Sequence, residues 1–307
     1  MFEGERAQEV ESHKPALSIL IKVRGALPNL RPAEQRVAEV VLADPATVSE
    51  SSITAVARHC QTSETTVLRF CRAIGLAGYP ELRIALARAA QWEETDQSSG
   101  APPNGRIDAT DTLREVVAKT THADARAIED TAAALNLDEL QSTVDAMVKA
   151  ARVDIYGSGQ SALIGHDLHQ KLHRIGMISF VWSDPHLSLT SAAVLNPGDV
   201  AIGISHTGTT NDTIDALGTA RSRGATTIAI TNFDGSPVTD EADHVLLTAS
   251  RETTFRSGAM SSRIAQLALV DCLFAAVAQH SYHHAIDALE STYAAVQSRH
   301  SGRRKRV

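Results

Sequence analysis

The second half of the chain, from Val153 onward, alternates short apolar runs with stretches of helical periodicity. The apolar runs are VDIYG, MISFVW, DVAIGIS, TTIAITN and HVLLTA. A strand that is apolar along its whole length is buried on both faces, and intervening helices supply the crossovers that parallel strands require. The pattern therefore predicts a doubly wound parallel sheet, an αβα sandwich of the α/β class.

The chain before these runs has helical patterns. The segment PAEQRVAEVVLADP carries Pro32 in its first turn and ends before Pro45, as a helix would. From Gln97 to Asp111, the segment QSSGAPPNGRIDATD gathers Gly, Pro, Ser and Asn without an apolar period, as linkers do. We therefore expect an all-α domain over residues 14–95, a linker over residues 96–111, and an α/β domain with two leading helices over residues 112–295.

Composition indicates the cellular compartment and the kinds of partner to expect. The three cysteines, Cys60, Cys71 and Cys272, lack metal-ligand spacing, which favours a reducing compartment and small core residues. The acidic N-terminus lacks a secretory signal, and no apolar run approaches the ~18 residues of a membrane span. We expect a cytoplasmic protein with no membrane partner. Formal net charge is -7, yet residues 52–90 carry five arginines against two glutamates, a local balance that suits contact with phosphates.

The segment SITAVARHCQTSETTVLRFCRAIG predicts two helices joined by a short turn. The residues of the second helix that are spaced for burial are Val67, Phe70, Cys71 and Ile74. Thr62 or Ser63 can cap this helix, which leaves Glu64, Thr65, Thr66, Arg69 and Arg72 on its outward face. Small polar residues in the first turn, with arginines behind them, suit a recognition helix in a major groove. An amphipathic helix pair in a bundle would show the same spacing, so the pattern alone leaves both interpretations open.

A longer run, TSETTVLRFCRAIGLAGYPELRIALARA, resembles the N-terminal DNA-binding domain of RpiR-type bacterial transcriptional regulators. The shared features are a Ser-x-x-Thr-Val-x-Arg-Phe-Cys core and a following Gly-Tyr-x-Glu-Leu stretch. The resemblance implies a helix-turn-helix domain with operator DNA as its partner. It also implies that Thr65, Thr66 and Arg69 face DNA, with Ser63 among the DNA-binding residues, and that Arg72, Tyr79 and Arg83 hold the DNA backbone.

Two loops follow predicted strands and offer groups that could bind an anion. The first contains Ser158, Gly159 and Ser161, and the second lies in AIGISHTGTTND. Hydroxyls and freed backbone N–H groups at the start of a helix favour a phosphate. A nucleophilic Ser/His/Asp site is disfavoured, because Ser205 and His206 are adjacent in an extended segment and point to opposite sides. A dinucleotide is also disfavoured, since Ala162 holds the third glycine position of the GxGxxG pattern.

The segments IYGSGQSALIGHDLHQKLHRIG, GDVAIGISHTGTTNDTI and ATTIAITNFDGSPVTDEADHVL resemble the sugar isomerase (SIS) domain that RpiR-type regulators carry. In SIS domains a Ser-x-Ser-Gly-x-Thr loop grips the phosphate of a phosphosugar. The resemblance implies an effector site formed by Ser158, Gly159, Ser161, Ser205, His206, Thr207, Gly208, Thr210 and Glu252. Here Thr207 replaces the second serine, and His206 fills a variable position. Glu252 stands where SIS enzymes place a sugar-contacting or catalytic glutamate, and a local pairing role is equally open.

Three histidines, His166, His169 and His173, are spaced to share one helix face. They permit a metal site, but without a carboxylate or thiolate anchor we expect neither a metal nor a cofactor. The resemblance implies a non-enzymatic regulator whose operator binding responds to a sugar phosphate, and which assembles as a homodimer or homotetramer. The alternative is a phosphosugar isomerase or lyase with an accessory helical domain, which would use Glu252 or a histidine as acid or base.

Overall fold

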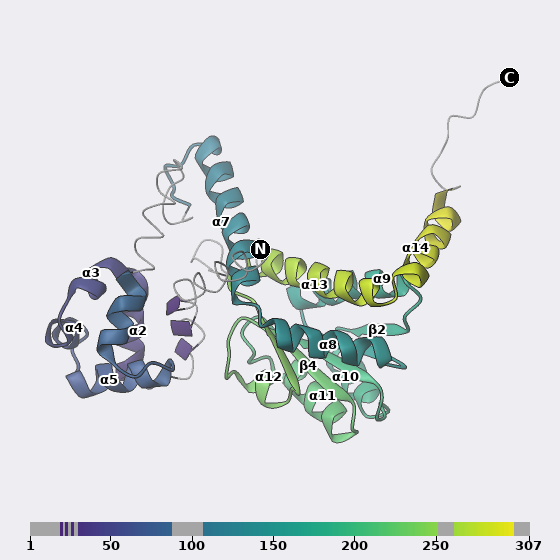
Figure 1. The fold of residues 1–307 in the computed structure, drawn as a ribbon, viewed down its shortest axis with the longest axis horizontal. Helices are drawn as coiled ribbons and strands as arrows, with labels where there is room; N and C mark the ends of the chain where they lie inside the picture. The colour runs from purple at the N-terminus through teal and green to yellow at the C-terminus, as the bar shows by residue number, and fades with distance from the viewer. Residues whose placement is uncertain are drawn as a thin grey trace, which may run out of the picture. The chain divides into compact units, whose positions relative to one another are not determined.

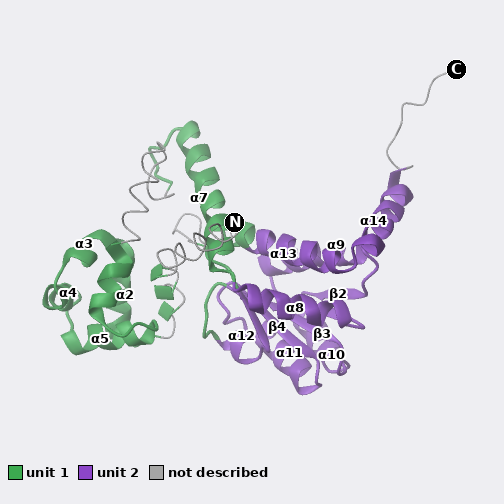
Figure 2. Cartoon of the chain, in the orientation of Figure 1, with its two compact units in different colours: residues 1–135, 232–236, 247–265 green, residues 136–231, 237–246, 266–307 purple. Residues whose placement is uncertain are grey.

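The computed structural model describes residues 19–20, 22–23, 26–27, 30–87, 107–250 and 261–297. The chain forms two compact units, which Figure 2 colours separately. The first comprises residues 1–135, 232–236 and 247–265, and the second comprises residues 136–231, 237–246 and 266–307.

The N-terminal part is helical, as the sequence predicts (Figure 1). Its helices are α2 (Pro32–Ala43), α3 (Pro45–Glu50), α4 (Ile53–His59) and α5 (Glu64–Ala73), and residues 79–87 are also helical. Side-chain caps fix where three of them begin: Asp44 accepts a hydrogen bond from Thr47 N, Ser52 from Ala55 N, and Ser63 from Thr66 N.

These helices share a core of their own. The apolar face predicted for α5 is confirmed, since Val67, Phe70, Cys71 and Ile74 are all buried. Side chains from the other N-terminal helices complete the cluster: Val37, Val41, Val56, Ala57, Leu82 and Leu86. A continuous apolar cluster holds α5 from behind and leaves its other face available.

Two helices precede the sheet, as predicted. Helix α7 spans Leu113–Ala134, and Thr112 caps it by accepting from Glu115 N. The Glu115 carboxylate accepts in return from Thr112 N at 2.7 Å, which completes a capping box. Helix α8 spans Leu137–Lys149, and the Asn136 side chain accepts from the first-turn N–H groups.

The predicted doubly wound sheet is confirmed. Its strands are β1 (Val153–Tyr156), β2 (Ser179–Trp182), β3 (Val200–Ile204), β4 (Thr226–Thr231) and β5 (His244–Leu247), in the order β2-β1-β3-β4-β5. Strand β1 pairs in parallel with β2 and β3, and β3 pairs in parallel with β4. Strands β1 and β3 are buried at every residue, as expected for strands covered on both faces.

Helices cover both faces of this sheet (Figure 1). The covering helices include α9 (Gln160–Arg174), α10 (Pro185–Ala192), α11 (Asn211–Ser222) and α12 (Pro237–Asp240). Helix α9 approaches the face of Ile155 so closely that a Cβ on Gly165 would lie 3.0 Å from the Ile155 side chain. Tyr156, the next residue, packs on the opposite face with Ala192 of α10 and Leu217 of α11.

Two long helices close the described chain, α13 (Ser261–His280) and α14 (Tyr282–Gln297). Among the described residues, α13 alone is long and apolar enough to cross a membrane by length and composition, and 44% of its most apolar window is buried. Core helices of globular proteins meet the same criterion. Cys272 on α13 is exposed, so its prediction as a core residue is wrong, whereas Cys60 and Cys71 are buried as predicted.

Candidate functional site

The turn between α4 and α5 is held by a residue of α2. The Arg36 guanidinium donates to Cys60 O at 3.1 Å and to Gln61 O at 3.2 Å. Gln61 has φ 49, a left-handed conformation that is uncommon for a residue other than glycine. The sequence around Arg36 does not indicate this role, because its hydrogen bonds join residues 24 and 25 positions apart. These bonds fix the angle at which α5 leaves the turn.

The exposed face of α5 carries most of the expected DNA-contacting groups. Thr65, Arg69 and Arg72 are exposed, as is Ser63 at the cap. Glu64 accepts a hydrogen bond of 2.6 Å from the Thr54 hydroxyl, which ties the first turn of α5 to α4. The arrangement leaves small hydroxyls at the N-terminal end of α5 and two guanidinium groups further along it.

Thr66 does not belong to this face. It is only 5% exposed, and its hydroxyl lies 3.1 Å from Ser63 Oγ and 3.4 Å from Arg69 Nη2. The prediction that Thr66 points outward is therefore wrong. Thr66 lies one helical turn before Phe70, so it faces the core and supports the cap.

Tyr79 is also buried, contrary to its expected place on the DNA backbone. Its hydroxyl donates to Ser51 O at 2.9 Å and lies 3.2 Å from Val48 O. Burial raises the pKa of the Tyr79 hydroxyl above its usual value. The nearby Arg83 is exposed, and its Nε donates to Ser49 O at 2.8 Å. Tyr79 thus holds the domain together from within.

A buried carboxylate lies beside Arg69. Glu34 Oε1 is 3.4 Å from Arg69 Nε, and the two side chains are 9% and 46% exposed. The other oxygen, Oε2, accepts from Arg31 N at 3.2 Å at the start of α2. Glu34 therefore orients the Arg69 guanidinium, a role that the local sequence around either residue does not indicate.

A second candidate site lies at the carboxyl end of the sheet, between β1 and β3. Here the order in which strands are added reverses, since β2 lies beyond β1 on one side and β4 lies beyond β3 on the other. Tyr156 and Gly203 are paired residues on these adjacent strands. The chain then leaves β1 into α9 on one face and leaves β3 into α11 on the other. Such a topological switch point is where open α/β sheets bind ligands.

The loop after β1 depends on two glycines. A Cβ on Gly157 would lie 3.1 Å from the backbone of Ser161, so a side chain there would require this backbone to shift by a few tenths of an ångström. Gly159 has φ 58 and ψ -122, which residues with a side chain rarely adopt. These constraints bring the half-buried Ser158 and Ser161 to the N-terminus of α9.

The loop after β3 is a tight turn organised by a buried serine. Ser205 Oγ accepts from Gly208 N at 3.1 Å and lies 3.1 Å from Thr210 Oγ1. Gly208 has φ 67 and its carbonyl accepts from Val238 N at 3.0 Å, so the turn is anchored on both sides. Thr207 Oγ1 is exposed and lies 2.9 Å from Thr209 Oγ1.

The polarity of this turn suits an anion. Thr210 is the N-cap of α11, and its side chain makes no capping bond, so the first-turn N–H groups lack that acceptor. A helix N-terminus carries positive partial charge. His206 is half-buried within the turn, and its carbonyl accepts from Thr231 Oγ1 at 3.2 Å. Asp212, exposed in the first turn of α11, is the acidic group nearest in sequence to this end.

A buried amide organises the ends of β4 and β5. Asn232 Oδ1 accepts from Ser250 N at 2.8 Å, from Ser250 Oγ at 3.1 Å, and from Thr248 Oγ1 at 3.2 Å. These bonds fix the start of the segment that contains Glu252. Glu252 itself lies outside the described residues, so its expected contact with the effector stays a prediction.

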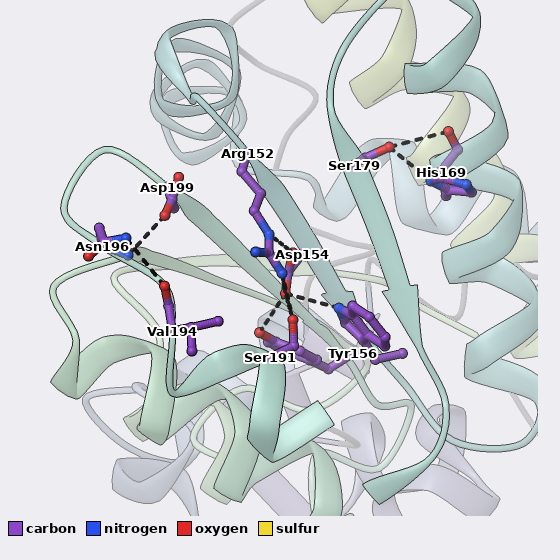
Figure 3. A network of polar contacts seen from close by, with 10 residues as sticks. Arg152, Asp154, Tyr156, His169, Ser179, Ser191, Val194, Asn196 and Asp199 are labelled. Atoms are coloured by element: carbon purple, nitrogen blue, oxygen red, sulfur yellow. Dashed lines mark hydrogen bonds and ion pairs between the residues drawn. The ribbon is translucent and has the colours of Figure 1, made fainter. Parts of the chain in front are cut away.

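A network of ionic and hydrogen-bonded side chains is centred on Asp154 of β1 (Figure 3). Asp154 is fully buried, and Arg152 Nε donates to it at 2.7 Å. Trp182 Nε1 and Ser191 Oγ also donate to this carboxylate, at 2.9 and 2.6 Å. The hydrogen bonds that Arg152 donates to Asp154 raise the pKa of the Arg152 guanidinium, which lies 4.8 Å from the Phe180 ring centroid. The network is satisfied internally, which indicates that it supports the fold.

The three histidines of α9 do share one side of the helix, but they form no metal site in the part of the chain described. Rings of His169 and His173 are 5.9 Å apart, and His169 Nδ1 lies 2.9 Å from Ser179 Oγ. Burial, helped by the neighbouring His173 and His166, lowers the pKa of His169. No group of three His, Cys, Asp or Glu side chains within the described ranges could hold an ion.

Comparison with known protein families gives two matches. A family model described as a helix-turn-helix domain of the rpiR family matches residues 17–93. A family model described as a SIS domain matches residues 146–276. The two models match in the order in which the sequence resemblances occur.

Relatives match along most of the chain. An HTH-type transcriptional regulator of Caldanaerobacter subterraneus is 39% identical over 276 residues, which cover 89% of this chain and 95% of the relative. The HTH-type regulator YbbH of Bacillus subtilis is 30% identical over 283 residues, 92% of this chain and 97% of the relative.

Solved structures match as well. The Vibrio vulnificus NanR protein, complexed with ManNAc-6P, aligns with a TM-score of 0.59 and 28% identity over 92% of this chain and 99% of that chain. The sugar isomerase domain of an RpiR transcription factor from Sphaerobacter thermophilus aligns with a TM-score of 0.54 and 28% identity, over 58% of this chain and 98% of that chain.

Proposed function

Because the chain belongs to the RpiR family of HTH-type transcriptional regulators, we propose that it binds operator DNA through α5 and that a sugar phosphate modulates this binding. The observation that carries the effector part is the Ser205–Thr210 turn at the β1/β3 switch point. NanR, similar to this chain over nearly its whole length, was solved with the sugar phosphate ManNAc-6P.

The phosphate would lie between the two loops that follow β1 and β3. The proposed effector residues described in the structure are Ser158, Gly159, Ser161, Ser205, His206, Thr207, Gly208 and Thr210, with Glu252 beyond the described residues. In this arrangement Ser205 shapes the turn, because its hydroxyl already accepts from Gly208 N. Thr207 and Thr210 would donate to phosphate oxygens together with the N–H groups that begin α11.

The DNA-binding surface would be the exposed face of α5. Ser63 and Thr65 lie at its N-terminal end, where a recognition helix meets base edges, and Arg69 follows one turn later. Arg72 and Arg83, both exposed, would contact phosphates. The burial of Thr66 and Tyr79 restricts their role to supporting this surface.

The remaining properties follow as parts of the same proposal. We place the helix-turn-helix domain at residues 14–95, the linker at 96–111, and the effector domain with its leading helices at 112–295. The protein would act in the cytoplasm as a homodimer or homotetramer, without catalysis, metal or cofactor. Isomerase-named neighbours such as a Listeria monocytogenes protein at 20% identity share the SIS fold, which by itself does not imply turnover.

A thermal-shift screen of phosphorylated sugars tests the effector site. Ligand that binds only the folded protein raises the melting temperature, by an amount that grows with its concentration over Kd. The double variant Ser205→Ala, Thr210→Ala should lose the shift. The matched control is Thr219→Ala, Ser222→Ala, which removes two hydroxyls from the other end of α11 and should keep it. An unchanged shift in the first variant would place the anion elsewhere.

Fluorescence anisotropy with the DNA upstream of the protein's own gene tests the proposed operator binding. Affinity should fall steeply with salt, and Arg69→Ala should weaken binding by about 5- to 100-fold, the range for losing one base contact. Absence of binding at low salt would refute the operator proposal. Turnover of aldose or ketose phosphates at ordinary enzymatic rates would instead favour the isomerase alternative.

A further inference from the structure

The first turn of α5 contains two exposed polar residues that take no part in its cap. Ser63 Oγ accepts from Thr66 N at 3.3 Å and lies 3.1 Å from Thr66 Oγ1, so the cap already engages both hydroxyls. Thr66 is also buried. The two residues that remain exposed and outside the cap are Glu64 and Thr65.

Glu64 is held in place from α4. The Thr54 hydroxyl donates to Glu64 Oε1 at 2.6 Å, and both side chains are exposed where the two helices pack together. The second oxygen, Oε2, has no hydrogen-bond partner among the residues that the structure describes. A short bond to a charged acceptor, between side chains ten positions apart, restricts the rotamers of Glu64. The carboxylate is therefore pre-organised with one oxygen available.

We propose that Glu64 reads a cytosine in the major groove of the operator, with Oε2 accepting from the N4 amino group of the base. The recognition helix of a helix-turn-helix domain contacts base edges with its N-terminal residues, and Glu64 is the first residue of α5. The inference rests on the proposed operator binding through α5, and it adds the identity of a base that this helix selects.

The donors and acceptors on the base edges favour cytosine. A carboxylate only accepts hydrogen bonds, so it needs a donor in the groove. Guanine presents acceptors at N7 and O6, thymine presents O4 and a methyl group, and adenine presents an N7 acceptor beside its N6 donor. Among the four bases, only cytosine offers a donor with no acceptor on its own major-groove edge. Glu64 should therefore favour cytosine over the other three bases.

Glu64 also has a structural effect that does not depend on DNA. A carboxylate in the first turn interacts favourably with the positive end of the helix dipole, which stabilises α5. This stabilisation, like the repulsion between the carboxylate and DNA phosphates, would affect binding to every sequence alike. A preference for one base at one position therefore distinguishes base reading from a purely structural role.

Selection of bound duplexes from a randomised DNA library tests the proposal with the full chain. Wild-type protein should enrich sites with cytosine at one position, and anisotropy with single-base variants should give a preference for cytosine there of about 5-fold or more. In Glu64→Gln this preference should move to adenine, because a glutamine amide can pair with adenine N6 and N7. The preferences at the other positions of the site should remain.

Glu50→Gln is the matched control, since Glu50 is an exposed residue of α3 and its replacement removes the same charge. It should keep the wild-type preference for cytosine. Thr54→Val removes the hydroxyl that holds Glu64 and should reduce the preference about 3-fold or more. Thr54→Ser keeps the hydroxyl and should retain the preference. Circular dichroism confirms that each variant is folded.

The selection separates failure of this inference from failure of the proposed function. If wild type and Glu64→Gln enriched the same bases at every position, Glu64 would not read the operator, while the proposed operator binding would stand. If wild type enriched no sequence, the operator proposal would fail, and the inference that rests on it would fail with it. A full cytosine preference in Thr54→Val would overturn the positioning of Glu64 by Thr54.

Discussion

Ala249 donates its backbone N–H to Thr131 Oγ1 at 3.0 Å, across 118 residues of sequence. Both residues are buried, and Thr131 lies near the end of α7, the helix that follows the proposed linker. Ala249 directly precedes Ser250, which Asn232 holds, and the segment with Glu252 comes next. The bond therefore joins α7 to the chain that leads into a proposed effector contact.

Replacing Thr131 with Val should reduce the response to the effector. The variant leaves the buried Ala249 N–H without an acceptor, which costs about 1–3 kcal/mol of folding free energy. We expect the ratio of operator Kd values measured with and without sugar phosphate to fall toward unity, because the two sites become less coupled. Affinity for the sugar phosphate itself, measured by calorimetry, should change less than about 3-fold.

Thr131→Ser is the control for this variant, because it keeps the hydroxyl and removes only a methyl group. It should retain both the stability and most of the wild-type ratio. If Thr131→Val kept the full ratio while losing stability, the bond would be structural and would carry no coupling.

Tyr79→Phe should separate folding from DNA binding. The hydroxyl bonds to Ser51 O and Val48 O are lost, so unfolding free energy should fall by about 1–2 kcal/mol in urea titrations. Operator Kd at a temperature where the variant is folded should be unchanged. Arg72→Ala should show the opposite pattern, since this arginine is exposed. A large loss of operator affinity in Tyr79→Phe would restore its predicted role on the DNA backbone.

Periodicity alone predicted most of the architecture. Every strand expected from an apolar run is present, because buried parallel strands leave a local signal. Helix starts at Pro32 and after Ser63 were also readable from local capping chemistry. The four-residue helix α12 was missed, since so short a helix has no periodic signal, and α14 was not predicted either.

The site was less predictable, since its supporting contacts join residues far apart in the chain. Arg36 holds the turn at Cys60, and Glu34 orients Arg69, and neither pairing has a sequence signal. A polar threonine near the start of α5 predicts an outward side chain, yet Thr66 lies one turn before the buried Phe70 and faces the core. Its hydroxyl is satisfied internally by Ser63 and Arg69, which allows burial at little cost.

Glu34→Gln should loosen DNA discrimination without weakening contact with DNA. The variant removes the charge beside Arg69 but keeps an oxygen that can accept from Arg31 N. With the guanidinium less constrained and one negative charge gone, non-specific affinity should rise about 2- to 5-fold and the specific-to-nonspecific ratio should fall. Competition anisotropy with scrambled DNA measures both.

Glu39→Gln is the matched control for Glu34→Gln, because Glu39 is exposed on the same helix and the charge change is identical. Equal effects from both variants would attribute the change to net charge alone and would remove Glu34 from the positioning of Arg69.

Asp154→Asn should strongly destabilise the SIS domain. Asp154 accepts from Arg152 through both carboxylate oxygens, whereas the asparagine amide has only one oxygen that can accept. Trp182 and Ser191 also lose a charged acceptor. Since Arg152 remains partly exposed, we expect a loss of about 2–4 kcal/mol in urea unfolding. Asp215→Asn, an exposed site on α11, should change stability by less than ~0.5 kcal/mol. Equal stability in the two variants would show that the network contributes little.

His169→Asn should flatten the dependence of stability on pH in the mildly acidic range. Burial lowers the folded-state pKa of His169 below the value of about 6.5 that is usual for histidine, so the unfolded chain takes up its proton first as pH falls. Stability due to this group is therefore full above about pH 6.5 and is lost progressively below it. Urea midpoints between about pH 7.5 and 5.5 should fall more for wild type than for the variant. A wild-type slope in His169→Asn would assign the titration to another group.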